Sequence, residues 1–226
     1  MCIYLVASSK PWFDNAPKSE EYQKLKTVQI HKKEELTLEL LEELNPRYIF
    51  FPHWSWIVPQ DVFSKYECVI FHTAPLPFGR GGSPIQNLIL HGLKNSPVCA
   101  LRMSETLDGG PIYSSKNVSL EGTIDEIFAR IAKCVADLIV SICQVEPSPK
   151  PQIGEVSFFK RLSPQDNELK PDLNLESLYD RIRMVDSDMY LRAYVPFGDR
   201  MIEFSQATLE GDEMVAQVRF VERKKR

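Results

Sequence analysis

One histidine and one aspartate stand at positions where side chains commonly carry out acid–base chemistry. His72 follows the apolar run 68–71, and Asp108 follows a second predicted strand at about 98–103. Ligands of open α/β sheets bind outside the carboxyl ends of the strands, so we expect the two side chains to meet there. An imidazole titrates near neutral pH and suits proton transfer with a substrate. The structural alternative is a hydrogen-bonded histidine and an ordinary Asp-Gly turn.

The elements that must position these residues are a loop and a helix. The loop 73–82 holds two prolines, which stiffen it, and three glycines, which loosen it. Ser83-Pro84 predicts the start of a helix, because Ser is a good N-cap and Pro is tolerated at the first helical position. We expect this helix to end near Gly92, before the strand that leads to Asp108.

The motifs around this loop resemble the signature of the folate-dependent formyltransferases. The matching motifs are His72–Pro77, Arg80-Gly81, Pro84-Ile85-Gln86 and Leu107-Asp108-x-Gly110. The family pattern runs Asn-x-His, a Ser-Leu-Leu-Pro turn, Arg-Gly, Pro-Ile and Leu-Asp-Thr-Gly. The resemblance covers about the first two thirds of the chain and implies an enzyme that uses N10-formyltetrahydrofolate and no metal. It also implies that His72 and Asp108 are the catalytic residues.

The chain departs from the family pattern two positions before the histidine. The family carries Asn there, whereas this chain has Ile70, which cannot donate a hydrogen bond to a developing oxyanion. Three explanations are open: a nearby amide, Asn87 or Gln86, takes over; protonated His72 or a backbone N–H suffices; or fast catalysis is lost. We favour compensation, because the histidine, the aspartate and the Arg-Gly motif are retained. Gly109 also replaces the usual Thr of the turn.

An aromatic loop follows the third predicted strand. Residues 52–59 contain two tryptophans, a composition that suits the binding of a flat heterocycle and equally a hydrophobic plug beneath the sheet. The resemblance implies that this loop forms part of the folate pocket. The cofactor-binding residues that we predict are Trp54, Trp56, Ile57, Val58, Ala74, Pro75, Leu76, Pro77, Leu101, Thr106 and Leu107.

Four further residues are candidates for contacting the acceptor substrate. Trp12 and Phe13 lie in a polar loop after the first strand, where they either stack on a sugar or base or fold back onto the core. Arg80 either binds an anionic substrate group or clamps loop carbonyls. Asn87 is the fourth candidate. The loop after the first strand has no GxGxxG turn, which argues against a bound NAD or FAD.

The apolar runs predict an α/β fold, and the resemblance implies a Rossmann-like, mostly parallel sheet with a small C-terminal α+β module. Strands are expected at 2–7, 27–30, 48–51, 68–71, 98–103 and 112–118, and helices at 34–44 and 124–143. The predicted catalytic core spans residues 1–145, a Pro-rich linker 146–156 and the module 157–226. Within the module we expect a helix at 175–184 and strands at 190–195, 201–204 and 214–220.

Composition limits the partners and the compartment. The 226 residues carry a formal charge of −4, which creates no bulk field for nucleic acid. The basic tail 223–226 is short, and no apolar run has the features of a signal peptide or the length of a membrane span. Five cysteines without CxxC spacing fit reduced thiols. We therefore expect a cytoplasmic protein that binds neither nucleic acid nor membrane.

The leading hypothesis is an N-formyltransferase that acts on an amino sugar, either nucleotide-linked or a nonulosonic acid of the pseudaminic type. A methionyl-tRNA formyltransferase is the first alternative, disfavoured by the short tail and the acidic charge. A glycinamide ribonucleotide formyltransferase fits less well, because the first strand is not followed by a Gly-rich phosphate loop. Ile70 motivates a fourth reading, a folate-binding homologue with impaired catalysis. The C-terminal module either packs beside the active site or forms a homodimer contact.

Overall fold

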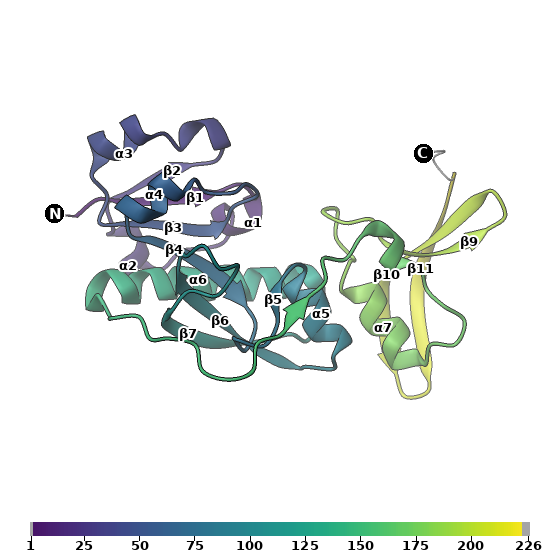
Figure 1. The fold of residues 1–226 in the computed structure, drawn as a ribbon. Helices are drawn as coiled ribbons and strands as arrows, with labels where there is room; N and C mark the ends of the chain where they lie inside the picture. The colour runs from purple at the N-terminus through teal and green to yellow at the C-terminus, as the bar shows by residue number, and fades with distance from the viewer. Residues whose placement is uncertain (1, 223–226) are drawn as a thin grey trace.

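A six-stranded sheet forms the centre of the N-terminal part of the molecule (Figure 1). The structure, a computed structural model, describes residues 2–222. The strands are β1 Tyr4–Ser8, β2 Thr27–Ile30, β3 Tyr48–His53, β4 Cys68–Thr73, β6 Asn95–Arg102 and β7 Ile112–Ser119. Their order is β2-β1-β3-β4-β6-β7; the first four are parallel, and β6 is antiparallel to both of its neighbours. The predicted fold class is confirmed.

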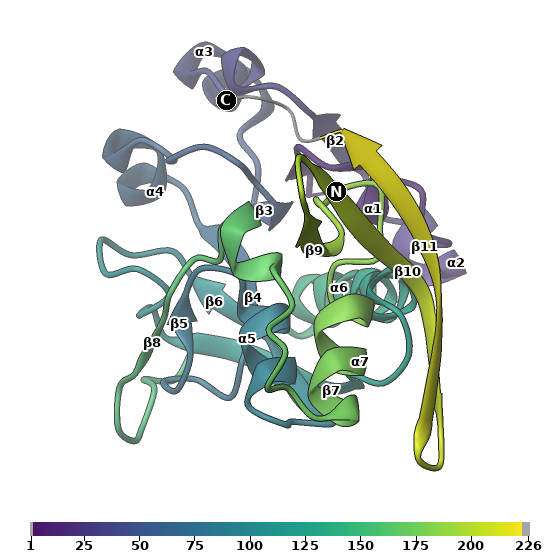
Figure 2. The same cartoon turned by 90° about the vertical axis from the view of Figure 1, so that its right-hand side faces the viewer.

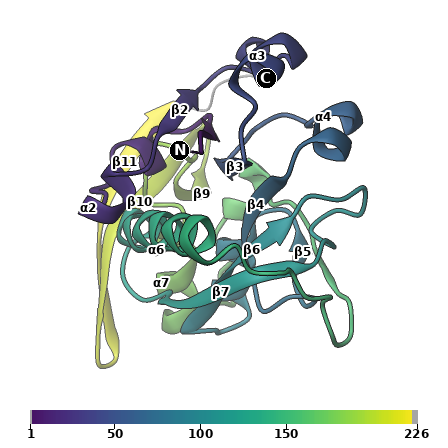
Figure 3. The same cartoon turned by 90° about the vertical axis from the view of Figure 1, so that its left-hand side faces the viewer.

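Apolar side chains cover both faces of this sheet, as expected for strands buried between two layers. One face packs against α6 (Ile124–Val145), accompanied by the short helices α1 (Pro11–Asp14) and α2 (Glu20–Gln23) (Figure 3). The other face packs against α3 (Leu38–Leu44) and α4 (Gln60–Lys65). Two hydrophobic clusters therefore hold the core, one on each side of the sheet.

Local side-chain caps mark where α6 and α3 begin. The predicted capping box at Thr123 is present, and α6 starts at the next residue. The helix predicted at 34–44 is wrong in its first part, because Lys33–Glu35 form a separate 3-10 turn. The hydroxyl of Thr37 accepts a hydrogen bond from the N–H of Leu40, and this second cap starts α3.

The direction of β6 contradicts the expectation that His72 and Asp108 follow the ends of two parallel strands. His72 lies within β4, and β6 is antiparallel to it, with Val69 opposite Arg102. The carboxyl end of β6 therefore lies beside the start of β4, and the loop 103–111 runs back toward His72. A strand that is buried on both faces reads the same in the sequence whichever way it runs, so the pattern did not reveal this direction.

The C-terminal module places one helix against an antiparallel three-stranded sheet (Figure 2). Its elements are α7 Leu175–Arg183, β9 Ala193–Phe197, β10 Arg200–Glu210 and β11 Glu213–Glu222. The predicted helix and strands are all present, and β10 and β11 are longer than expected. Because β10 and β11 follow each other directly, they form an extended hairpin.

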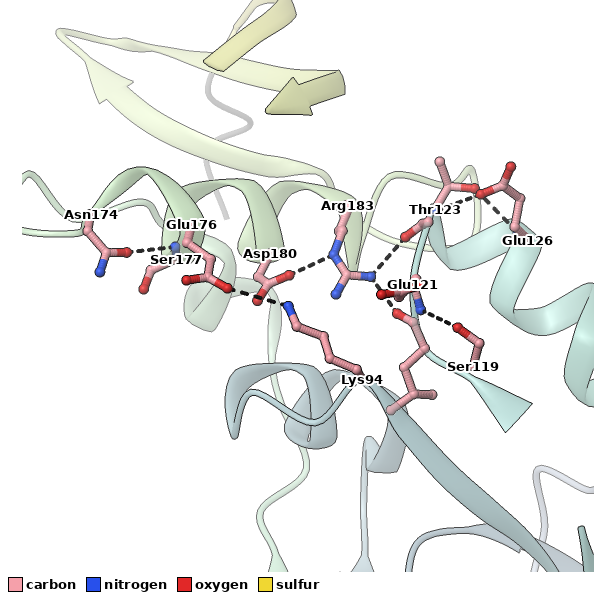
Figure 4. Close-up of polar contacts among 12 residues, drawn as sticks. Lys94, Ser119, Glu121, Thr123, Glu126, Asn174, Glu176, Ser177, Asp180 and Arg183 are labelled. Atoms are coloured by element: carbon pink, nitrogen blue, oxygen red, sulfur yellow. Dashed lines mark hydrogen bonds and ion pairs between the residues drawn. The ribbon is translucent and has the colours of Figure 1, made fainter. Parts of the chain in front are cut away.

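Arg183 connects the module to the core (Figure 4). Its side chain is 4% exposed, and Nη1 donates to the carbonyl oxygens of Leu120 at 2.7 Å and Gly122 at 2.8 Å. Its Nε donates to Asp180 Oδ1 at 2.6 Å, within the same helix. These bonds tie α7 to the turn between β7 and α6.

The Pro-rich segment after α6 runs along the core instead of standing away from it. Lys150 exchanges two backbone hydrogen bonds with Ile112, the first residue of β7. Further on, β8 (Phe158–Phe159) pairs in parallel with β5 (Arg80–Gly81), just before α5 (Pro84–Leu90). The segment therefore brings its side chains close to the Arg-Gly motif.

Candidate active site

His72 is a buried imidazole near the carboxyl end of β4. Its side chain is 7% exposed, and strand alternation places it on the sheet face opposite α6, like Ile70. Nε2 lies 2.8 Å from the carbonyl oxygen of Gly79, so Nε2 carries a proton and donates it there. Nδ1 faces Asp108 Oδ2 at 3.5 Å, the distance of an ion pair and longer than a good hydrogen bond. The predicted pairing of His72 with Asp108 is therefore seen in the geometry.

Asp108 lies in a turn whose shape depends on the glycines that follow it. Its φ is +48°, in the left-handed region that non-glycine residues adopt uncommonly. Its Oδ2 accepts a hydrogen bond from the N–H of Gly81 at 2.9 Å. A Cβ on Gly110 would lie 1.8 Å from the carbonyl oxygen of Arg102, so glycine is required there. A Cβ on Gly109 would lie 2.5 Å from Cγ2 of the exposed Thr106 side chain, so a larger residue there would require Thr106 to shift.

Gln152 is a site residue that the sequence analysis missed. Its Oε1 accepts hydrogen bonds from Arg80 Nε at 3.2 Å and Nη2 at 2.7 Å. Its Nε2 donates to the carbonyl oxygens of Asp108 at 2.8 Å and Gly110 at 2.9 Å. Arg80 is itself buried and directs its guanidinium at this side-chain amide. The only signal in the sequence was a Gln among prolines, which indicates an extended spacer and not a contact.

Neither predicted amide is free to replace the family asparagine. Asn87 is buried and donates to three backbone carbonyls at 2.9, 3.0 and 3.1 Å, so its prediction as a substrate contact is wrong. Gln86 is also buried and donates to the carbonyl oxygen of Met184 at 3.4 Å. Ile70 is half-buried and packs in the hydrophobic cluster of this face. The explanations that stay open are a backbone N–H or protonated His72, and slow catalysis.

The aromatic loop lies at the same edge of the sheet as His72, because β3 and β4 are adjacent parallel strands. The rings of Trp54 and Trp56 meet edge to face at 4.9 Å. Trp56 is 38% exposed and Ile57 projects into solvent, whereas Val58 is buried in the core. Trp54 Nε1 is buried, and no hydrogen-bond partner for it lies among residues 2–222. Val58 has little side-chain surface to offer a ligand.

The other residues predicted to contact folate differ in how far their side chains are buried. The side chains of Ala74 and Leu101 are fully buried in the core, which leaves their backbone groups for any ligand contact; their assignment to the folate pocket stays a prediction. Thr106 and Leu107 are exposed on the loop that carries Asp108. The residues of the turn after β4 are Pro75 and Leu76, half-buried, and Pro77, buried.

The two aromatic residues after β1 fold onto the core. Phe13 is fully buried and packs edge to face on Tyr22, so its prediction as a substrate contact is wrong. Trp12 is half-buried and stacks on Phe128 of α6 at 5.6 Å. The physical reason is the helix α1, which turns this loop inward over the end of α6.

Two basic side chains act on His53 beside the aromatic loop, although the whole chain is acidic. Burial, followed by the nearby charges of Lys10 and Arg161, holds the pKa of His53 below its usual value. His53 ends β3, Lys10 follows β1 and Arg161 follows β8, so the two cations reach His53 from separate segments. Net charge averages over the whole surface and does not report such a local field.

Other sequence predictions concern membranes, metals and the tail. No helix within residues 2–222 is both long and apolar enough to cross a membrane. The same part of the chain contains no group of three His, Cys, Asp or Glu side chains that could hold a metal ion. The basic tail 223–226 lies outside the described residues.

Comparison with known proteins identifies two family matches. Residues 8–142 match the model of the formyl transferase family, and residues 164–221 match that of the methionyl-tRNA formyltransferase C-terminal domain. A methionyl-tRNA formyltransferase from Sulfurimonas denitrificans is 30% identical over 141 residues, covering 60% of this chain and 46% of that protein. The chain spans about half the length of the curated relatives it matches.

Solved structures extend this likeness to the module. A methionyl-tRNA formyltransferase from Clostridium thermocellum superposes with a TM-score of 0.91 at 38% identity, covering 99% of this chain and 100% of that one. A likely sugar N-formyltransferase from Mycobacterium tuberculosis reaches 0.73 at 16% identity, covering 94% and 100%, and shares the fold alone.

These names overturn two predictions. The amino-sugar acceptor and the exclusion of nucleic acid are wrong as leading readings, because the more similar relatives are named for a tRNA substrate. The error came from using net charge and tail length as measures of a local binding surface. The prediction of a folate-dependent formyltransferase is confirmed at the level of the family, since the matched model covers more than half of the chain. The chain belongs to the formyl transferase family.

Proposed function

We propose that this chain transfers the formyl group of N10-formyltetrahydrofolate to the amine of methionyl-tRNA. The observation that carries the proposal is the buried His72, whose Nδ1 faces the Asp108 carboxylate at 3.5 Å. The likeness of nearly the whole chain to a structure named methionyl-tRNA formyltransferase supports this choice of acceptor. The family match of residues 164–221 supports it independently.

Formyl transfer joins the acceptor nitrogen to the formyl carbon and breaks the bond from that carbon to N10 of the folate. The attacking amine must lose a proton and the departing nitrogen must gain one. His72 suits both tasks, because the Gly79 carbonyl holds Nε2 while Nδ1 is able to accept and return a proton. The Asp108 carboxylate stabilises the imidazolium that forms in between.

The aromatic loop fits a flat heterocycle. A buried Trp54 Nε1 without a partner among the described residues is a donor that a ring nitrogen or carbonyl of a ligand could satisfy. The half-exposed Trp56 offers a face on which such a ring could stack. We propose that Trp54, Trp56 and Ile57 hold the folate, with Pro75, Leu76, Thr106 and Leu107 on the other side of the site.

A single-turnover assay tests this proposal. Enzyme in excess is mixed with N10-formyltetrahydrofolate and methionyl-tRNA, and formyl-methionine is measured after deacylation. Wild type should form product, and His72→Gln should form it at least about 10²-fold more slowly, as for a lost acid–base group. Wild type that binds folate and forms no product would contradict the proposal.

A catalytically impaired folate-binding protein is the second candidate, and Ile70 is the observation that favours it. The substitution Ile70→Asn restores the amide that the family carries. If the chain is impaired, this variant should raise the single-turnover rate by about 10²-fold, the contribution of one oxyanion donor. An unchanged or lower rate would exclude a missing donor as the cause of slow catalysis.

We retain the division into a core at 1–145, a linker at 146–156 and a module at 157–226 as a proposal. The end of α6 at Val145 supports the first boundary. The pairing of β8 with β5 means that the first residues of the proposed module also contact the core. Homodimer formation stays a prediction.

A further inference from the structure

The turn that carries Asp108 lacks an apolar anchor. Thr106 and Leu107 are exposed, and Leu107 has 61% of its surface in solvent. Since β6 ends beside the start of β4, the loop 103–111 must return along the sheet to bring the carboxylate to His72. Polar contacts therefore have to hold the turn in place. One is the N–H of Gly81, which donates to Asp108 Oδ2.

The side-chain amide of Gln152 supplies a second polar anchor for this turn. Its NH2 group donates to the carbonyl oxygens on both sides of Gly109, at 2.8 and 2.9 Å. Its oxygen accepts from two nitrogens of Arg80, which belongs to the same β5 strand as Gly81. One amide thus connects the turn that bears the carboxylate to the strand that orients it.

The position of Gln152 is determined by its neighbours in the chain. Lys150, two residues earlier, is bonded to Ile112 through both of its backbone groups, at 2.7 and 2.8 Å. Prolines at 149 and 151 restrict the backbone on either side of Lys150. On the other side, the N–H of Gly79 donates to the Ser157 hydroxyl at 2.9 Å. The amide is therefore presented to the turn by a short, anchored stretch of chain.

We infer that Gln152 is a positioning residue, which holds the Asp108 turn at the distance from His72 that proton transfer requires. It acts through Asp108 and touches neither reacting group. The inference rests on the proposed function only for its turnover measurement. The segment expected to be a spacer is accordingly part of the active-site architecture.

The substitution Gln152→Glu tests this role. Glutamate keeps an acceptor for Arg80, but it loses both N–H donors and brings a carboxylate toward two carbonyl oxygens. We expect kcat to fall about 10- to 100-fold, the cost of a misplacement near 1 Å, while both KM values change less than about 3-fold. If Gln152→Glu does not fold, Gln152→Met replaces it in the test. Methionine is of similar size and makes neither contact, so kcat should fall to a similar extent.

A double-mutant cycle separates positioning from a general loss of structure. In the Asp108→Asn background, Gln152→Glu should lower kcat by less than about 2-fold, because the carboxylate it positions is already gone. Equal losses in both backgrounds would overturn the inference. Gln60→Ala is the matched control: Gln60 also donates from a side-chain amide to loop 103–111, at Glu105, away from the turn. Its kcat should stay within about 2-fold of wild type.

Crystal structures of wild type and Gln152→Glu give a readout that needs no acceptor. The distance between His72 Nδ1 and Asp108 Oδ2, 3.5 Å here, should lengthen by about 1 Å or more in the variant. An unchanged distance would overturn the inference. Wild type that does not formylate methionyl-tRNA would refute the proposed function, and this distance would still decide the role of Gln152.

Discussion

Two buried acid–base pairs perform different tasks in this molecule. Arg183 and Asp180 are one helical turn apart, with Nε 2.6 Å from Oδ1, and Arg183 Nη1 donates to two backbone carbonyls. His72 and Asp108 come from separate segments and approach only to 3.5 Å, with the aspartate in a left-handed conformation. The first pair is held to the core by short hydrogen bonds, whereas Nδ1 in the second pair has only its 3.5 Å contact with Asp108 among the described residues.

The comparison shows that burial of charge does not by itself indicate function. Arg183 is as buried as His72, yet its Nε and Nη1 donate to one carboxylate and two backbone carbonyls. A buried pair that is also hydrogen-bonded across a junction stabilises it, because removing one partner leaves the other uncompensated. A pair that is long, strained and anchored from several segments is suited to exchange a proton.

The strongest way to break the comparison is to exchange the two aspartates for asparagine. Asp108→Asn should lower kcat at least about 10²-fold, since the imidazolium loses its carboxylate, with little change in the free energy of unfolding. Asp180→Asn should lower the free energy of unfolding and leave kcat almost unchanged. Steady-state kinetics and urea unfolding on both variants measure the four values. Near-normal turnover in Asp108→Asn would remove the site assignment.

The second prediction concerns the stability of the junction. Arg183→Ala should lower the free energy of unfolding by about 3–5 kcal/mol, because it leaves a buried carboxylate and two buried carbonyls without partners. Urea denaturation followed by circular dichroism measures this loss. Arg200→Ala is the control, because its ion pair with Glu222 is exposed and should be worth less than about 1 kcal/mol. Similar losses in the two variants would contradict the structural role of Arg183.

The third prediction sharpens the contrast between an open site and a closed junction. Trp56→Ala should weaken the binding of tetrahydrofolate by about 5- to 10-fold, equivalent to roughly 1 kcal/mol of lost ring stacking. Isothermal titration calorimetry measures the affinity. Val215→Ala, which also removes an exposed apolar side chain but on β11, should leave it unchanged. Equal affinities in wild type and Trp56→Ala would count against the folate pocket.

The smallest expected effect concerns the stability contributed by His53, a partly buried imidazole outside both pairs. Burial and the charges of Lys10 and Arg161 lower the pKa of His53, whereas His72 faces a carboxylate. A lowered pKa in the folded state means that the unfolded chain binds the proton first. Stability should therefore rise with pH from the folded pKa up to the unfolded value of about 6.5. Urea unfolding between pH 5 and 7.5 should show this slope for wild type and a flatter one for His53→Gln; identical slopes would contradict it.

Several features of the fold followed from patterns within single segments. The apolar runs of β1, β3 and β4 and the capping box at Thr123 identified strands and the longest helix. The spacing of His72, Arg80 and Asp108 identified the family. Each of these signals lies within a few residues or depends on residue types that appear in order along the chain, so a linear reading captures it.

Other features depended on contacts between distant segments. The direction of β6, the inward turn of Phe13 and the engagement of Asn87 with backbone carbonyls cannot be read from a local window. Gln152 is the clearest case, because its role comes from three segments that meet only after folding.

The sequence by itself therefore determined the class of fold and the family, and it singled out His72 and Asp108 as the candidate reacting pair. Only the tertiary structure decided how those side chains meet and what holds them together. The physical reason is that residue type and periodicity specify which chemistry and which local conformation are available. The distance and direction between two groups depend on strand order and loop paths, which the whole chain sets cooperatively.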